Sequence, residues 1–210
     1  MQILKKVLIS LVFLTLVGFG IYQMNKPKQV VEVPIEEAPS VTEVDTDTGI
    51  FTNTNFTFKY QKDVIAKDYN ETSQWRTNTQ TNGVFHVGIL IPGSVQPNTN
   101  FREAKFSVGS SSDPVAITDC LLPTNGERAK GEVTINDVVF KKITLTDAGA
   151  GNYYDTTSYR TMHGGNCYAI EYTIHSSNLR NYSPEQNIQE FDTPFIVKSL
   201  EDMVQSFKFL

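Results

Sequence analysis

Alternating apolar and polar positions dominate the chain after about residue 50, and this period of two predicts a β-rich domain. The alternating segments, each bounded by turn residues, are 56–60, 84–91, 104–108, 132–145 and 153–174, with a short closing strand at 206–209. Turn residues within the fourth and fifth segments, Asn136-Asp137 and His163-Gly164-Gly165, divide each of them into a hairpin. The second segment is almost continuously apolar, which is typical of a central strand.

Two helices are predicted between the strands. The first is short, opens at Ser112 or Asp113 with Pro114 in its first turn, and includes Cys120. The second has Thr193 as its expected cap and Pro194 as its start. Its apolar residues fall on one face at helical spacing: Ile196, Val197, Leu200, Met203 and Val204. The expected fold class is therefore α+β, an antiparallel sheet packed by helices.

The N-terminal segment has a different pattern. An uncharged apolar run, VLISLVFLTLVGFGIYQM at 7–24, has lysines on both sides. Crossing a bilayer core takes about 20 apolar residues, so the run is just long enough. We expect 1–24 to be a signal anchor that forms a single transmembrane helix, with a cytoplasmic N-terminus and an exported remainder. The alternative is secretion after signal cleavage, for which Gly18-Phe19-Gly20 is a poor cleavage site.

Composition changes again after the apolar run. Residues 25–50 are rich in proline, valine and acidic side chains, which predicts a disordered acidic linker. Residues 51–210 then form one extracytoplasmic domain, long enough for a core of its own. The linker segment Asp45-Thr46-Asp47-Thr48-Gly49 is similar to the start of a calcium loop. Phe56 stands where that loop needs a bidentate glutamate, so we expect no calcium there.

The charge balance excludes a nucleic-acid partner. The chain has 18 Lys+Arg against 23 Asp+Glu, a formal net charge of −5, and no basic stripe along any segment. The glycine-rich stretch Gly149-Ala150-Gly151 lacks the lysine and the strand-to-helix context of a phosphate loop. The three histidines, His86, His163 and His175, do not have the spacing of a metal site. We therefore expect no cofactor and no metal ion.

Two cysteines, Cys120 and Cys167, both lie in the domain expected to be exported. An even number of cysteines outside the cytoplasm favours a disulfide. In the chain-entropy account, closing a loop of this length stabilises by roughly 4 kcal/mol. Two buried thiols, or one reactive thiol, are the alternatives.

The order of these elements resembles a known family. An opening FTFKY strand at 56–60, a long antiparallel meander, and a late amphipathic helix running into VQSFKF at 204–209 are similar to PsbP-like domains. The resemblance implies an α/β/α sandwich and an accessory or binding role rather than catalysis. Gln61 stands where such domains often carry proline, and no binding residue of the family can be placed on this chain. Membrane-anchored bacterial proteins also look similar.

One enzymatic alternative is a sortase-like cysteine transpeptidase. Such enzymes are also anchored to the membrane by an N-terminal helix. Cys120 would be the thiolate, His86 the acid and Arg128 the group facing the oxyanion. The local sequence AITDC replaces the strand that such enzymes have before the cysteine. Cys167 also offers Cys120 a partner.

Five tyrosines gather in the second predicted hairpin: Tyr153, Tyr154, Tyr159, Tyr168 and Tyr172. Alternation puts Tyr168 and Tyr172 on one face. Ordinary strand and core packing is one interpretation. The other is an aromatic surface for a peptide, a glycan or another protein.

The sequence thus favours a non-enzymatic, membrane-tethered extracytoplasmic domain that binds or assists an envelope partner, either a protein or a glycan. A cell-envelope transpeptidase or hydrolase and a structural surface protein are the alternatives.

Overall fold

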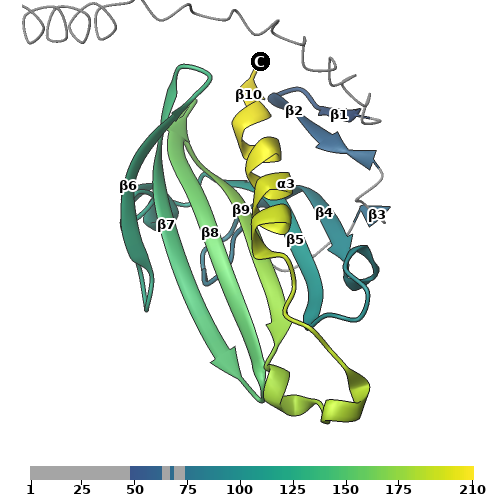
Figure 1. Ribbon diagram of the computed structural model, residues 1–210. Helices are drawn as coiled ribbons and strands as arrows, with labels where there is room; N and C mark the ends of the chain where they lie inside the picture. Colours follow the sequence, from purple (N-terminus) through teal and green to yellow (C-terminus); the bar gives the residue numbers. More distant parts are fainter. Residues whose placement is uncertain (1–47, 63–66, 69–73) are drawn as a thin grey trace, which may run out of the picture. The chain divides into compact units, whose positions relative to one another are not determined.

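Two antiparallel sheets form the framework of the computed structural model, which describes residues 48–62, 67–68 and 74–210 (Figure 1). The large sheet has seven strands in the spatial order β3-β4-β5-β9-β8-β7-β6. These strands are β3 (Lys67–Asp68), β4 (Val84–Pro92), β5 (Phe101–Ser111), β6 (Arg128–Ile135), β7 (Val138–Gly149), β8 (Asn152–His163) and β9 (Asn166–Ser177). The small sheet has the order β1-β2-β10 and consists of β1 (Thr48–Thr52), β2 (Phe56–Gln61) and β10 (Lys208–Phe209).

Two tight turns fix the register of the hairpins on one side of the large sheet. Asn136 and Asp137 both have positive φ, 44° and 67°, and they join β6 to β7. Gly164 and Gly165, at 56° and 80°, join β8 to β9 in the same way. Two consecutive positive φ values match the right-handed twist of the strands, and Asn, Asp and Gly tolerate them best. Both hairpins were predicted from these turn residues.

Helical segments connect the strands. The two α-helices of the described residues are α2 (Pro114–Thr118) and α3 (Thr193–Ser206). Three short 3-10 turns are η2 (Gly93–Val95), η3 (Leu179–Asn181) and η4 (Pro184–Gln186). Neither α2 nor α3 has the length and apolarity that a membrane span requires. The expected transmembrane segment at 1–24 lies outside the described residues.

Helix α3 covers one face of the large sheet, and the small sheet lies beside the C-terminal end of the helix (Figure 1). Asp192 caps the helix by accepting a hydrogen bond from the Phe195 amide at 3.0 Å. The cap is therefore one residue earlier than Thr193, the residue expected from the sequence. The buried side of the helix consists of Ile196, Ser199, Leu200, Met203 and Val204.

Aromatic rings join the small sheet to this core. Phe58 of β2 lies 5.1 Å from Phe106 of β5, centroid to centroid, and Phe56 lies 5.1 Å from Phe207. All four side chains are at most 1% exposed. Because the sheet's Tyr168, Ile170, Tyr172 and Ile174 face the same cluster, this side of the molecule holds the main hydrophobic core.

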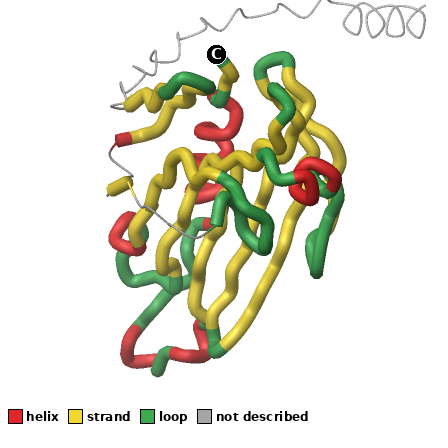
Figure 2. The backbone as a smooth tube through the Cα atoms, turned by 180° about the vertical axis from the view of Figure 1, so that it is seen from behind, coloured by secondary structure: helices red, strands yellow, loops and turns green. Residues whose placement is uncertain are grey.

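The opposite face of the large sheet is covered differently (Figure 2). Helix α2 and a segment beginning at Gln74 lie over one end of it, where Trp75, Ala116, Cys120, Cys167 and Ala169 form a small second cluster. Within the described part of the chain, no helix as long as α3 lies on this face. The resemblance implied an α/β/α sandwich, with helices over both faces of the sheet. In the described residues, a long helix covers only one face.

The main elements agree with the predictions, with one difference at α2 and two at the start of the domain. Helix α2 ends at Thr118, so Cys120, which was expected inside it, lies in the turn that follows, where its amide bonds to the Ile117 carbonyl at 3.4 Å. Strand β1 begins at Thr48, inside the range 25–50 that was assigned to the linker, and pairs along its length with β2. The alternation there is too short to detect without its partner strand. The small sheet itself was not predicted, because β10 and β2 are joined only by long-range pairing.

Candidate functional site

A groove of about 380 Å³ lies on the face of the large sheet that α3 leaves uncovered. Its floor comes from the middle of β5, β8 and β9, where Ser107, Thr156 and Thr173 present small polar side chains. Phe85 of β4 and Leu145 of β7 line it from strands on either side. The volume falls in the range of small-molecule sites. We call this feature the groove.

One end of the groove is exposed and carries both signs of charge. Glu103 and Lys105 are joined by an ion pair of 3.5 Å and are each about one-third exposed. His175 stacks on Tyr154 with ring centroids 4.4 Å apart, and its Nε2 lies 3.0 Å from Asn152 Oδ1. Burial lowers the pKa of His175, and the Glu103 carboxylate opposes that shift only in part, which favours a neutral ring near pH 7.

The other end of the groove is closed by the segment that carries Trp75 and Arg76. The Trp75 backbone lies directly on β5, where a Cβ at Gly109 would be 1.9 Å from its carbonyl oxygen. Only glycine permits that approach. The Trp75 ring is 2% exposed, and its Nε1 donates to Thr81 Oγ1 at 3.1 Å. The packing of Trp75 thereby directs the next side chain, Arg76, toward the sheet.

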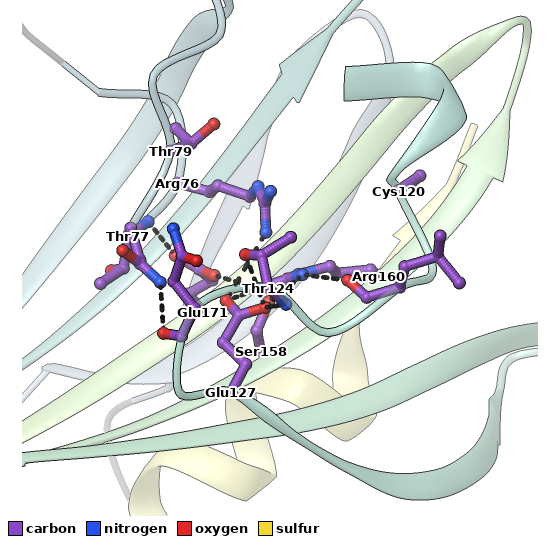
Figure 3. Close-up of polar contacts among 12 residues, drawn as sticks. Arg76, Thr77, Thr79, Cys120, Thr124, Glu127, Ser158, Arg160 and Glu171 are labelled. Carbon is purple, nitrogen blue, oxygen red and sulfur yellow. Dashed lines mark hydrogen bonds and ion pairs between the residues drawn. The ribbon is translucent and has the colours of Figure 1, made fainter. Parts of the chain in front are cut away.

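Four buried charged side chains meet at this closed end (Figure 3). Arg160 of β8 is fully buried and binds both carboxylate oxygens of Glu127. Its Nη2 also lies 3.9 Å from Oε1 of Glu171 on β9. Arg76 Nη1 lies 3.7 Å from Glu127 Oε1. We call Arg76, Glu127, Arg160 and Glu171 the charge cluster; its formal charge is zero.

Glu127 is the best-satisfied member of the charge cluster. Besides Arg160, it accepts hydrogen bonds from the amide of Thr124 at 2.8 Å and from the Thr124 hydroxyl at 3.1 Å. Burial acts to raise the pKa of Glu127, but the hydrogen bond from Arg160 and the other contacts outweigh it and hold the pKa below its usual value. Glu127 is therefore a carboxylate at neutral pH, and its role is to neutralise Arg160.

Arg76 and Glu171 are the poorly satisfied members, and both line the groove. Glu171 accepts a hydrogen bond from the Thr77 amide on Oε2 at 2.6 Å, but its Oε1 is buried without a hydrogen-bond partner among the described residues. The same holds for Nε and Nη1 of Arg76. The two side chains are only 5% and 3% exposed. Buried polar groups in folded proteins are almost always paired, so these three atoms require an explanation.

A second cavity of about 520 Å³ lies on the other face, between α3 and the sheet. Among the described residues, none of the buried side-chain polar atoms that line it lacks a hydrogen-bond partner. Asn100, for example, donates to the carbonyl of Ser177 at 2.8 Å and accepts from the Phe191 amide at 3.0 Å. The groove is therefore the stronger candidate site, because its closed end leaves buried polar atoms unpaired.

The sequence identified one chemical feature of this region, the disulfide. Cys120 and Cys167 form a disulfide in the structure, with Cα atoms 5.6 Å apart, and the described residues contain no free cysteine. The bond joins the segment after α2 to β9, next to Trp75. It therefore holds the cover of the groove's closed end against the sheet.

The five tyrosines do not share one surface. Tyr159, Tyr168 and Tyr172 are buried on the α3 face, where ordinary core packing accounts for them. Tyr153 and Tyr154 are 40% and 38% exposed, and as neighbours on β8 they point to opposite faces. Tyr154 alone lines the groove.

The residues of the sortase-like alternative also lie apart. His86 packs between Phe56 and Tyr168 on the core side, and its Nε2 lies 2.8 Å from Ser110 Oγ. Cys120 is oxidised in the second cluster, and Arg128 is exposed. Burial lowers the pKa of His86, so the ring is neutral. This arrangement does not supply the thiolate and imidazolium that the chemistry needs.

The charge cluster was not predicted. Its members come from four segments that are far apart in the sequence, and no local pattern links them. One signal was available: Glu171 is a charge inside the stretch CYAIEYTI of β9, whose other residues are uncharged and mostly apolar. A charge at such a position implies a buried partner.

Comparisons with known proteins leave the chain without a family. No family model matches it, and no curated protein is similar enough to be reported as a relative. The crystal structure of a protein from Bacteroides thetaiotaomicron VPI-5482 is similar at a TM-score of 0.30 and 12% identity. The match covers 78% of this chain and 42% of the other, so this chain spans less than half the length of that protein.

Proposed function

We propose that this protein is a non-enzymatic binding module, tethered to the membrane outside the cytoplasm, that holds an envelope protein or glycan in the groove. The carrying observation is the groove itself. It is a polar depression on the sheet face that α3 leaves uncovered, and it ends at a buried charge cluster in which three atoms make no hydrogen bond. Structural packing alone does not account for such a lining.

The proposed compartment rests on two features. The apolar run at 7–24 predicts an anchor, and the Cys120–Cys167 disulfide suits an oxidising compartment. A PsbP-like relationship would agree with this reading, since that family supplies accessory and binding domains. We retain it as part of the proposal.

The test places a photo-reactive amino acid, p-benzoylphenylalanine, at the rim of the groove in the full-length protein. Asp147 is suitable because it lines the groove and is exposed. The matched control is the same replacement at Lys198 on α3, whose side chain is 75% exposed on the far side of the sheet. Irradiation of cells that make the protein should give a discrete adduct from position 147 and none from position 198.

Mass spectrometry of the adduct then distinguishes a protein from a glycan. Equal labelling at both positions would mean that the groove has no special role in binding. No adduct at position 147, with the variant present at its normal level, would contradict the proposal directly.

A further inference from the structure

Three buried atoms at the closed end of the groove make no hydrogen bond, and their chemistry indicates which ligand group could bind there. This inference rests on the proposed function. Arg76 offers N–H donors at Nε and Nη1, while Glu171 offers an acceptor at Oε1. A partner must therefore accept from one residue and donate to the other. Leaving either group unpaired in a buried site is unfavourable, so a partner that satisfies both is preferred.

Charge narrows the choice further. The charge cluster contains two arginines and two glutamates, so it is already neutral without a ligand. An anion would pair with Arg76 but face the Glu171 carboxylate, and a cation would meet the opposite conflict. Like charges brought together in a buried site are strongly disfavoured. The cluster therefore selects a neutral group.

We propose that the closed end of the groove is a recognition site for an amide group of the ligand, with its carbonyl oxygen accepting from Arg76 and its N–H donating to Glu171. An amide carries a strong acceptor and a strong donor on adjacent atoms and has no net charge. The rest of the ligand follows the groove along β9 toward Tyr154 and His175. Glu171 and His175 are four positions apart on that strand, which is a length of about 13 Å.

Arg76 makes only a loose contact within the cluster, because its Nη1 lies 3.7 Å from Glu127 Oε1 and makes no hydrogen bond. Its guanidinium lies over the Trp75 ring at 5.4 Å, and Trp75 is fixed by its contact with Gly109. Arg160 is already the bidentate partner of Glu127. The donor edge of Arg76 is thus positioned beforehand, which lowers the ordering cost of binding.

The first experiment compares three small probes that share a ring and differ in charge: benzamide, benzoate and benzylammonium. Binding to the full-length protein in a mild detergent is measured by ligand-observed saturation-transfer NMR. We expect benzamide to bind about tenfold or more tightly than either charged probe, because only the amide leaves no group unpaired.

Substitutions at the two residues should reverse this preference. Glu171→Gln removes one of the two carboxylates and gives the charge cluster a formal charge of +1, so benzoate should become the best probe. Arg76→Gln removes one of the two arginines and gives the charge cluster a formal charge of −1, so benzylammonium should become the best probe. The control is Glu132→Gln, the same change of charge at an exposed position on β6, which should leave the order unchanged. Each variant is first compared with the parent by circular dichroism and thermal melting.

Amides occur in peptides and in N-acetylated sugars, so a second set of probes separates these sources. N-acetyl-dialanine amide binding alone indicates a peptide, and N,N′-diacetylchitobiose binding alone indicates a glycan. A charged probe that outcompetes benzamide on the parent protein would overturn the amide site and leave the groove as a binding site. Absence of binding by all probes would overturn it too, and the cross-linking at position 147 would then decide the proposed function separately.

If Glu171→Gln or Arg76→Gln unfolds the protein, the probe order on the parent still tests the inference. Competition supplies a second readout in that case. Benzamide should displace N-acetyl-dialanine amide or diacetylchitobiose, whichever binds, and benzoate should not. Failure of benzamide to displace a bound amide would place the amide elsewhere.

Discussion

The two faces of the seven-stranded sheet differ in what they bury. On the α3 face, aromatic and aliphatic side chains from the helix, the small sheet and the large sheet form a continuous core. On the groove face, the buried atoms include the charge cluster and a disulfide, and part of the sheet remains open. Neighbouring residues of the same strands contribute to both, as Ile170 and Glu171 do on β9.

The difference shows how stability and specificity are divided. Burial of apolar surface is non-directional and tolerates small changes of shape, so the α3 face can carry most of the folding free energy. Buried charges need complete and directional pairing, and they contribute little net stability compared with apolar residues of the same size. Charges at the groove therefore suggest a requirement other than stability.

The largest effect should come from a charge placed in the core of the α3 face. Leu200→Asp would bury a carboxylate at a position with 0% exposure inside the hydrophobic core cluster, at a cost of about 5 kcal/mol or more. The chain should fail to fold at ordinary temperature, as measured by circular dichroism and urea unfolding. The matched control is Leu122→Asp on the groove side, where the residue is 55% exposed, and its stability should change by less than about 1 kcal/mol. A Leu200→Asp variant as stable as the parent would show that α3 is not part of the core.

A smaller loss should follow removal of the disulfide on the groove face. The bond closes a loop with a sequence separation of 47, which in the chain-entropy account corresponds to roughly 4 kcal/mol. We expect the Cys120→Ser, Cys167→Ser double variant to lose about that amount in urea unfolding, with the Trp75 cover loosening first. Tryptophan fluorescence reports this directly, because Trp75 is the single tryptophan of the chain. Two reactive thiols in the denatured parent, made in an oxidising compartment, would contradict the disulfide.

Breaking the charge cluster should have the next largest effect. Glu127→Gln leaves Arg160 buried without its carboxylate, which costs about 3 kcal/mol. The comparison is the exposed pair of α3, Lys198 and Asp202, at 2.6 Å. Asp202→Asn should change stability by less than about 1 kcal/mol, because solvent screens exposed ion pairs. Urea unfolding of both variants measures the contrast, and equal losses would mean that the cluster is not effectively buried.

Local sequence patterns predicted one face of the sheet far better than the other. Apolar periodicity located α3, and alternation with turn residues located both hairpins, because each signal lies within a short window of sequence. The α3 face follows from these patterns, since spacing puts Leu200 on the apolar side of the helix and places Tyr168 and Tyr172 on one face of their strand. The start of β1 at Thr48 was missed because its strand partners are needed to recognise it.

The groove face depends on contacts between residues that are far apart in the sequence, and no short stretch of sequence contains both partners. Arg76, Glu127, Arg160 and Glu171 meet only after β9 has paired with both β5 and β8. The approach of Trp75 to Gly109 likewise requires the folded sheet. Cysteine counting reached the disulfide because oxidation chemistry restricts two cysteines to one pairing. Nothing comparable restricts which buried charges become partners.

The smallest expected effect is a change in stability at low pH, and it should differ between the two faces. On the α3 face, Glu201 accepts from Tyr159 at 2.6 Å, from Tyr172 at 2.7 Å and from Lys142 at 3.0 Å, which attaches the helix to the sheet. Burial acts to raise the pKa of Glu201, but the tyrosine hydrogen bonds and Lys142 outweigh it and hold the pKa below its usual value.

A carboxyl whose pKa is lowered by folding stabilises the protein above its unfolded pKa, and this contribution is lost as pH falls through the folded pKa. The parent should therefore lose stability below about pH 4.3, the ordinary pKa of a glutamate. Tyr159→Phe removes one donor, so it should cost about 1 kcal/mol at pH 7 and raise the pKa of Glu201 toward its ordinary value. Because the remaining shift is smaller, stability should fall less steeply with acid than in the parent.

Glu127 on the groove face keeps its own lowered pKa in this variant and serves as the internal reference. Two-dimensional NMR of the glutamate carboxyl groups, titrated between about pH 6 and pH 2, should show Glu201 titrating at a higher pH in Tyr159→Phe than in the parent, with Glu127 unchanged. Equal movement of both groups would mean that the two faces respond to acid as one unit. The division between a stabilising face and a recognition face would then not extend to their electrostatics.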